Sequence, residues 1–348
     1  MVSAMDKLEG NTIEHGGSLS RAALAFTDAP QPWIDLSTGV NPHSYAYSPV
    51  PATAFSRLPD PSELRDLCAI AARAYGAKSG DHVAAAPGTH LFLPMLVESV
   101  FSGRDRSSLT AAILSPTYAE HAKTARMLGF QTVEASDPDA LEAADLAVVV
   151  NPNNPDGRMI ADERLLALSH SLAKKGGLLL VDEAFRDVMD EPSSLVAQVH
   201  PGLAVLRSFG KFFGLAGIRL GFAVASPDHA QHVRHLLGPW AIPGPTLHIG
   251  RQALADQVWQ KNMRLRLRQE AERLDGLLAQ ADLPVVSGTT LFRYARHEQA
   301  SEIHQVLGKA GILVRRFSER PQFLRFGLPS EGEWERLGAV LCSKNWQS

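Results

Sequence analysis

The sequence contains little cysteine and no long hydrophobic run. Its two cysteines, Cys68 and Cys342, form no metal-binding spacing, which argues against a disulfide framework or a cysteine-based metal site. The longest apolar runs, Leu146–Val150 and Leu178–Val181, are far too short to span a bilayer. Residues 1–10 contain no apolar segment of the kind found in secretory signals. We therefore expect a cytoplasmic protein of a reducing compartment, with no membrane and no metal as partner.

The chain also lacks an excess of charge of one sign. It has 34 Lys and Arg against 37 Asp and Glu, a net charge of −3, so it offers no basic surface for nucleic acid. Apolar residues make up 45% and charged residues 20% of the 348 positions, as in an ordinary globular protein. This length suggests about two domains with room for a large core.

Apolar strands and helical patterns alternate through the middle of the chain. We predict strands at Thr110–Leu114, Leu146–Val150, Leu178–Val181, Ala204–Leu206 and Leu220–Val224, and helices from Ser62, at Tyr118–Leu128 and at Asp162–Ala173. Such alternation predicts an α/β fold with a mostly parallel sheet between helices.

The two ends of the chain have a different character. Residues 1–50 are rich in Gly, Pro and Ser, which predicts an arm and not a packed unit. We expect this arm to contribute to the small domain and the active site. Residues 51–245 form the predicted large domain. Residues 246–348 form an interdomain helix, Leu247–Ala281, and a smaller α+β domain. Its predicted elements are strands at Thr290–Tyr294, Ile312–Arg315 and Phe323–Phe326, and helices at Glu298–Ala310 and Glu331–Leu341.

A lysine lies in a glycine-rich segment just past one of the predicted strands. Lys211 ends Ser208-Phe209-Gly210-Lys211, and Arg219 lies eight residues further on. An amine near a buried strand is partly desolvated, which lowers its pKa and allows a Schiff base with an aldehyde. A lone lysine in such a loop is usually a surface residue. The Ser208 hydroxyl and the Arg219 guanidinium, which suits bidentate phosphate binding, favour a functional interpretation.

Polar side chains follow two other buried strands. Asp182 ends the most apolar strand, at the edge where α/β sheets bind ligands, and it suits either pairing with a pyridinium nitrogen or helix capping. Asn151–Gly157, with the sequence N-P-N-N-P-D-G, has the composition of a turn. An Asn amide at this place can also donate to a phenolate oxygen.

Two weaker candidates come earlier in the chain. Gly88, Thr89 and His90 lie between a short strand and a helix, where backbone N–H groups bind phosphate. Tyr118 follows another strand, so its ring either stacks on a planar cofactor or packs in the core.

The joint order and spacing of three motifs is highly specific. N-P-N-N-P-x-G, V-D-E-A-F and S-F-G-K-x-F-G-L-A-G-I-R resemble the fold-type-I enzymes that use pyridoxal 5′-phosphate (PLP), of the aspartate-aminotransferase fold. The resemblance runs from about Gly88 to Arg325, within the branch of histidinol-phosphate aminotransferases and threonine-phosphate decarboxylases. It implies PLP as cofactor and a homodimer with active sites at the subunit interface.

The resemblance also implies a role for each matching residue. Lys211 carries the cofactor as a Schiff base, and Asp182 pairs with its pyridine nitrogen. Asn154 donates to the ring hydroxyl oxygen, and Tyr118 stacks on the ring face. Arg325 binds the substrate carboxylate. The cofactor phosphate is bound by Ser208, Arg219 and the backbone of Gly88, Thr89 and His90.

Two positions depart from the pattern of the relatives. Phe185 stands where many relatives have Tyr, so a hydrogen bond to the ring hydroxyl is missing. Leu58, in Leu58-Pro59-Asp60, stands where relatives have a Tyr that reaches the neighbouring subunit's cofactor phosphate. Another residue must replace that donor, or phosphate binding is weaker.

The cofactor motifs do not name the reaction, because PLP labilises whichever bond at the substrate Cα stands perpendicular to its ring. Phe185 and the segments His15-Gly16-Gly17 and Asp35–Pro42 are most similar to the threonine-phosphate decarboxylases of cobalamin biosynthesis. Those lyases convert L-threonine O-3-phosphate into (R)-1-amino-2-propanol O-2-phosphate and CO₂. A histidinol-phosphate aminotransferase is the alternative. A non-catalytic, regulatory PLP-binding protein is disfavoured, because the lysine, Asp and arginine set is intact and because the sequence has no basic helix-turn-helix segment.

Four residues are candidates for contacting this phosphorylated substrate besides Arg325. Asn154 and His15 belong to the motifs above. Arg315 and Arg316 end a predicted strand close to Arg325 in the fold, and each on its own is more often a surface arginine.

Overall fold

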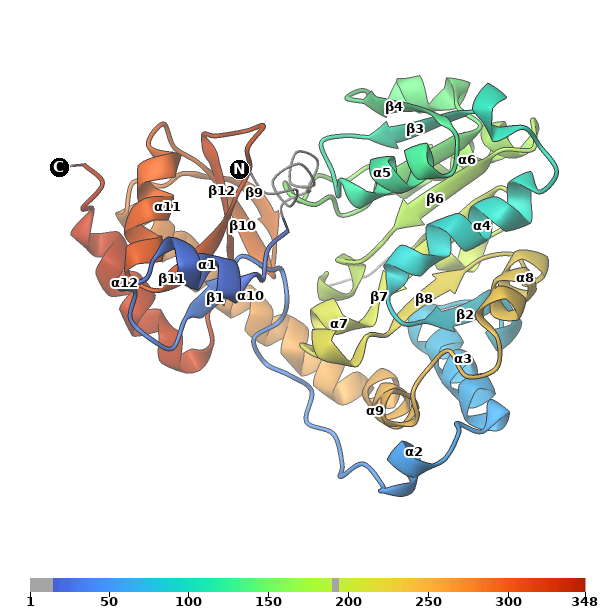
Figure 1. Cartoon of the computed structure of the whole chain (residues 1–348), viewed down its shortest axis with the longest axis horizontal. Coiled ribbons are helices and arrows are strands. Elements are labelled where there is room, and N and C mark those ends of the chain that lie inside the picture. The colour runs from blue at the N-terminus through green and yellow to red at the C-terminus, as the bar shows by residue number, and fades with distance from the viewer. Residues whose placement is uncertain (1–14, 190–193, 348) are drawn as a thin grey trace, which may run out of the picture.

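The computed structural model describes residues 15–189 and 194–347, which form two lobes around one β-sheet each (Figure 1). The larger sheet has seven strands in the order β2-β8-β7-β6-β5-β3-β4. These are β2 (Val83–Ala86), β3 (Thr110–Leu114), β4 (Gln131–Ala135), β5 (Leu146–Val150), β6 (Leu178–Asp182), β7 (Leu203–Ser208) and β8 (Gly221–Val224). Only β8 runs antiparallel to its neighbours, so the predicted α/β class with a mostly parallel sheet is confirmed.

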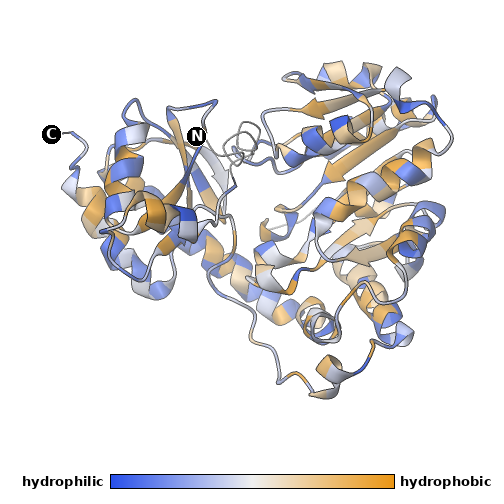
Figure 2. Cartoon of the chain, in the orientation of Figure 1, coloured by the Kyte–Doolittle hydropathy of each residue, from blue (hydrophilic) through white to orange (hydrophobic). Residues whose placement is uncertain are grey.

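Helices cover both faces of the large sheet. α4 (Phe92–Phe101), α5 (Glu120–Met127) and α8 (Pro227–Leu237) share one apolar core with it, and α3 (Pro61–Tyr75), α6 (Asp162–Ala173) and α9 (Gly244–Ala255) share the other. Every residue of β5 and β6 is buried, and the sheet interior is hydrophobic in Figure 2. A strand that is apolar on both faces is typical of a sheet between two helical layers.

The smaller lobe contains a five-stranded sheet with the order β1-β11-β12-β10-β9. Its strands are β1 (Ile34–Leu36), β9 (Val285–Thr289), β10 (Phe292–Arg296), β11 (Ile312–Arg316) and β12 (Phe323–Gly327). Around it lie α1 (Leu19–Ala25), α11 (Ala300–Lys309) and α12 (Trp334–Ser343), whereas the short α2 (Thr53–Ser56) and α7 (Phe209–Phe212) belong to the other lobe (Figure 1).

The prediction that residues 1–50 form an unpacked arm is wrong for β1. This strand pairs in parallel with β11, and Leu36 is completely buried. Three residues are too few to show a strand period, and the surrounding Gly, Pro and Ser hide the signal. Residues 1–14 of the predicted arm lie outside the described residues.

The prediction of one helix over Leu247–Ala281 is also wrong. The chain forms α9 and then α10 (Gln257–Gln280), separated at Asp256. The Asp256 carboxylate accepts a hydrogen bond from the backbone N–H of Trp259 at 2.9 Å, which caps α10 and stabilises the break. α10 then runs from the large lobe to the small one (Figure 1). No helix in the described part of the chain has both the length and the apolar composition needed to cross a membrane.

Candidate active site

A cavity of about 950 Å³ opens at the carboxyl edge of the large sheet, and residues of both lobes line it. Neighbouring parallel strands end together at this edge, because Val150 of β5 is in register with Asp182, and Asp182 with Leu206 of β7. The structure brings nearly all the predicted site residues into this cavity. They are His15, Gly88, Thr89, His90, Tyr118, Asn154, Asp182, Ser208, Lys211, Arg219 and Arg325.

Lys211 reaches the cavity from α7, which begins directly after Ser208 at the end of β7. Burial, together with the positive charge of Arg325, lowers the pKa of its amine to about 8, against the opposing effect of Asp182. Asn41, from the segment after β1, fixes the Lys211 backbone by donating its own N–H to the Lys211 carbonyl at 2.9 Å. The site therefore holds a lysine amine that is partly neutral near physiological pH.

Asp182 is buried and has a partner that the sequence analysis missed. Nε2 of His121 lies 3.0 Å from one Asp182 carboxylate oxygen, and the backbone N–H of Ala184 donates to the other at 3.1 Å. His121 comes from α5, one turn after Tyr118, and it is buried as well. Its position three residues after Tyr118, which precedes α5, was the only signal available for it. This pair orients a carboxylate at the cavity wall.

Tyr118 lies against the same histidine. Its ring meets His121 edge-on at 5.4 Å between ring centroids, and the His15 ring lies 6.0 Å away on another side. Burial raises the pKa of the phenol, and the nearby charges of Glu120 and Asp182 raise it further. Tyr118 is thus a neutral, positioned aromatic ring that lines the cavity, suited to stacking on a planar ligand.

Arg325 of β12 connects three parts of the site. One guanidinium nitrogen donates to the side-chain oxygen of Asn154, and another donates to the backbone carbonyl of Ser37 at 2.8 Å. With its oxygen engaged, the Asn154 amide keeps its N–H₂ donors for a ligand. Each terminal nitrogen of the guanidinium carries two N–H groups and uses one in these contacts, so Arg325 retains donors for an anion.

The other asparagines of the N-P-N-N-P segment stabilise the turn itself. Asn151 exchanges two hydrogen bonds with the backbone of Ile160, at 3.0 and 2.9 Å. Asn153 accepts from the Thr117 hydroxyl at 2.7 Å and donates to the Pro116 carbonyl. The turn interpretation is therefore confirmed for Asn151 and Asn153, whereas Asn154 lines the cavity and its contact with a ligand stays a prediction.

Gly88 and Thr89 lie close to Arg219 and Gly221 where β2 leads into α4. Gly88 has a φ of +102°, and a Cβ at this position would lie 2.5 Å from an Arg219 guanidinium nitrogen. A Cβ on Gly221 would similarly lie 2.7 Å from the Thr89 backbone nitrogen. Glycines at these positions let backbone N–H groups and a guanidinium approach one point, as phosphate binding requires.

Phe185, the first departure from the relatives, forms part of the cavity wall. Its ring is buried, meets Phe292 edge-on at 5.1 Å, and lies 5.7 Å from the Lys211 amine. The wall beside the lysine is apolar here, which fits the expected loss of a hydroxyl donor. Leu58, the second departure, is 69% exposed and does not line the cavity.

One residue that was predicted to contact the substrate lies outside the cavity wall of the small lobe. Arg316 is exposed and is not part of the cavity wall, whereas Arg315 is. Successive side chains of a strand point to opposite sides, so only one of two adjacent arginines can face the cavity. Arg320, in the loop after β11, also lines the cavity and was missed, because an irregular loop has no pattern that predicts where its side chains point.

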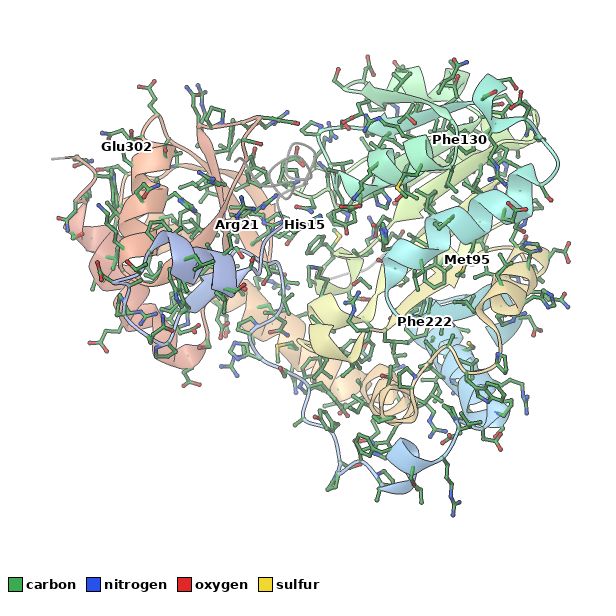
Figure 3. The ribbon with its side chains drawn as sticks, in the orientation of Figure 1. His15, Arg21, Met95, Phe130, Phe222 and Glu302 are labelled. Atoms are coloured by element: carbon green, nitrogen blue, oxygen red, sulfur yellow. The ribbon has the colours of Figure 1, made fainter. Side chains whose placement is uncertain are left out.

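His15 connects the N-terminal segment to the large lobe, and Figure 3 shows it between the lobes. Its Nε2 lies 2.9 Å from a carboxylate oxygen of Glu120 on α5. Two residues later, the backbone N–H of Gly17 donates to the Ser37 hydroxyl at 2.7 Å. The His15-Gly16-Gly17 segment therefore passes over the cavity, with a contact on each lobe.

Several known proteins are similar to this chain in sequence. The family model "Aminotransferase class I and II" matches residues 106–341. A threonine-phosphate decarboxylase of Pseudomonas aeruginosa is 39% identical over 333 residues, which cover 94% of this chain and 97% of that protein. One of Sinorhizobium sp. is also 39% identical, with 93% and 96% covered. A histidinol-phosphate aminotransferase of Aeromonas hydrophila is 28% identical, with 77% and 80% covered.

Solved structures share the fold. A histidinol-phosphate aminotransferase from Sinorhizobium meliloti, in complex with pyridoxal-5′-phosphate, superposes with a TM-score of 0.80. The superposition covers 99% of this chain and 98% of that one at 20% identity, so it describes the fold alone.

Proposed function

The chain belongs to the aminotransferase class I and II family, and from this premise we propose that it is a PLP-dependent lyase that decarboxylates L-threonine O-3-phosphate. The product is (R)-1-amino-2-propanol O-2-phosphate. The observation that carries the proposal is the convergence of Lys211, Asp182 and Arg325 in one cavity. Identity to threonine-phosphate decarboxylases, at 39% over almost the whole chain, supports the choice of reaction.

The residues present fit the cofactor. The anion cradle of Gly88, Thr89, His90, Ser208 and Arg219 would bind its phosphate. Asp182 would pair with the pyridine nitrogen, Asn154 would donate to the ring hydroxyl oxygen, and Tyr118 would cover the ring. Lys211 would hold PLP through its amine until the substrate amine takes its place, and the bound cofactor would then supply the electron withdrawal that weakens the bonds of the substrate Cα.

The protein then decides which bond breaks by holding the substrate. Arg325 binds the substrate carboxylate through donors that its contacts with Asn154 and Ser37 leave available. Asp182, oriented by His121, supplies the negative charge that balances the cofactor ring during loss of CO₂. Lys211, whose pKa is about 8, can carry a proton to Cα near neutral pH.

The substrate phosphate needs cationic partners of its own. Arg315 lines the cavity from β11, and His15 lines it from the N-terminal segment. Glu120, whose carboxylate lies 2.9 Å from Nε2 of His15, holds this imidazole at the cavity. Arg316 is no longer a candidate, because its side chain is exposed outside the cavity wall.

The protein is further proposed to be a cytoplasmic homodimer that serves cobalamin biosynthesis. Three apolar side chains support the dimer: Phe55, Leu58 and Trp240 are 71%, 69% and 55% exposed. They belong to neighbouring segments. Phe55 is part of α2 and Leu58 follows it; α2 packs on α9, and Trp240 lies in the loop directly before α9. Exposed apolar side chains on adjacent segments are typical of a subunit interface.

Product analysis tests the proposed reaction. The PLP-loaded protein is incubated with L-threonine O-3-phosphate without any keto acid, and the products are identified by mass spectrometry. A product lighter by one CO₂, with the cofactor still present as PLP, supports the decarboxylase. Unchanged substrate, together with turnover of histidinol phosphate after addition of 2-oxoglutarate, would make the protein an aminotransferase instead.

A further inference from the structure

The loop between β11 and β12 forms the outer wall of the cavity. Phe317, Ser318, Glu319 and Arg320 of this loop all line the cavity, next to Arg315 at the end of β11. The loop connects two strands of the small lobe, so its position is defined at both ends by the sheet. It carries a guanidinium, that of Arg320, to which the reaction steps above assign no role.

Three aromatic rings support this loop. Tyr294 of β10 stacks on Phe323 at 4.7 Å between centroids with an angle of 7° between the rings, and it meets Phe317 edge-on at 5.7 Å. Tyr294 is 2% exposed, so the base of the cluster is rigidly packed.

Each outer ring of the cluster carries one arginine. The guanidinium carbon of Arg315 lies 5.4 Å from the centroid of Phe317, and that of Arg320 lies 6.0 Å from the centroid of Phe323. Cation–π contacts at such distances restrict where a long side chain can lie. The aromatic cluster therefore positions two guanidiniums at the cavity wall.

The small lobe thus directs three positive charges, those of Arg315, Arg320 and Arg325, into one cavity. Arg315 is close enough to Arg325 to contribute to the lowering of the Arg325 pKa to about 10, after the larger effect of burial. Like charges in one cavity repel, and anions that bind between them relieve this cost. Glu319 is exposed on the loop, so solvent screens its charge.

The proposed substrate has two anionic groups, and Arg325 binds the carboxylate. We propose that Arg320, held on the Phe323 ring, binds the phosphate of the substrate together with Arg315 and so selects for a phosphorylated amino acid. This inference rests on the proposed function for the identity of the substrate. A planar guanidinium suits this task, because it donates two parallel hydrogen bonds to phosphate oxygens.

The test measures binding of the phosphorylated product, which undergoes no decarboxylation and lacks the carboxylate. Calorimetry gives the Kd of 1-amino-2-propanol O-2-phosphate for the PLP-loaded wild type, Arg320→Ala and Arg320→Lys. Arg296→Ala is the matched control, because Arg296 is exposed, contacts the same loop through Gln322 at 3.2 Å, and does not line the cavity. The unphosphorylated 1-amino-2-propanol is titrated in parallel.

We expect Arg320→Ala to raise the Kd of the phosphorylated amine by roughly 10- to 100-fold, as for loss of a charge-assisted hydrogen bond. Arg320→Lys should recover part of the loss, and the Kd of the unphosphorylated amine should not change. In turnover of L-threonine O-3-phosphate, the KM should rise with little change in kcat. The PLP absorption spectrum should match that of the wild type.

The inference is overturned if Arg320→Ala, like the control Arg296→Ala, binds the phosphorylated amine with the Kd of the wild type. It is also overturned if the wild type does not bind the phosphorylated amine more tightly than the unphosphorylated one. An equal loss of affinity for both amines would show a structural role and would overturn it as well. If the wild type binds the phosphorylated amine through Arg320 but releases no CO₂ from L-threonine O-3-phosphate, the proposed reaction fails and the assignment of Arg320 stands.

Discussion

The lowered pKa of Lys211 leads to a quantitative prediction about cofactor capture. The neutral amine is the form that attacks the PLP aldehyde carbon. With a pKa of about 8, roughly one quarter of the Lys211 amines are neutral at about pH 7.5, against about one in a thousand for an ordinary lysine. At this pH, the cofactor-free protein should therefore capture PLP about 200-fold faster than it would if Lys211 had the pKa of an unperturbed lysine.

The assay follows the absorbance of bound PLP after mixing with the cofactor-free protein over a series of pH values. N-acetyl-lysine amide, measured over the same series, corrects for titration of PLP itself. The capture rate should rise with pH, reach half of its plateau value near pH 8 and level off above it. Arg325→Leu removes a repelling positive charge and should raise the midpoint. Asp182→Asn removes an attracting negative charge and should lower it.

Two controls make the result decisive. Lys211→Met should abolish covalent capture, and Arg296→Leu, which removes a positive charge outside the cavity wall, should leave the midpoint in place. A midpoint near the ordinary lysine value of about 10.4 in the wild type would refute the argument. If the midpoint were unchanged in both Arg325→Leu and Asp182→Asn, the charges of these residues would not affect the pKa of the Lys211 amine.

Further predictions concern the cofactor contacts. His121→Leu removes the buried partner of Asp182 and should lower kcat at least tenfold with little change in KM, as steady-state kinetics would show; an unchanged kcat would exclude a positioning role. Gly88→Ala places a Cβ 2.5 Å from an Arg219 nitrogen at a φ of +102° and should weaken PLP retention by about 2 kcal/mol, measured as the Kd of the cofactor. Phe185→Tyr adds a hydroxyl beside Lys211 and should shift the pH at which the PLP absorption band changes, whereas an identical titration would contradict the role given to Phe185.

The sequence alone was enough to find the catalytic edge of the sheet. β5 and β6 are buried on both faces and therefore form continuous apolar runs, whose ends are visible without a structure. Asp182 and Asn154 follow these ends within a few residues, so their meeting in one cavity follows from parallel strand order. α6 has the predicted bounds, Asp162–Ala173, for the similar reason that a long amphipathic period is a strong local signal.

Two other features of the fold could not be predicted in this way. β1 is a strand because β11 pairs with it, and its three residues carry no period of their own. The break at Asp256 depends on one capping hydrogen bond, which competes with a helical pattern that continues on both sides. Local propensity is weak in both cases: a tertiary contact decides that β1 is a strand, and a local side-chain cap decides the break at Asp256.

The sequence by itself thus determined the fold class, the lysine and the residues of the cofactor motifs, because each is encoded within a few residues of a strand end. Only the tertiary structure paired His121 with Asp182 and placed Arg325 beside Asn154, which lies 171 positions away. It also selected Arg315 over Arg316 and brought Arg320 to the cavity wall. The physical reason is that side-chain direction in a short strand or loop depends on what packs against it, and these partners come from other parts of the chain.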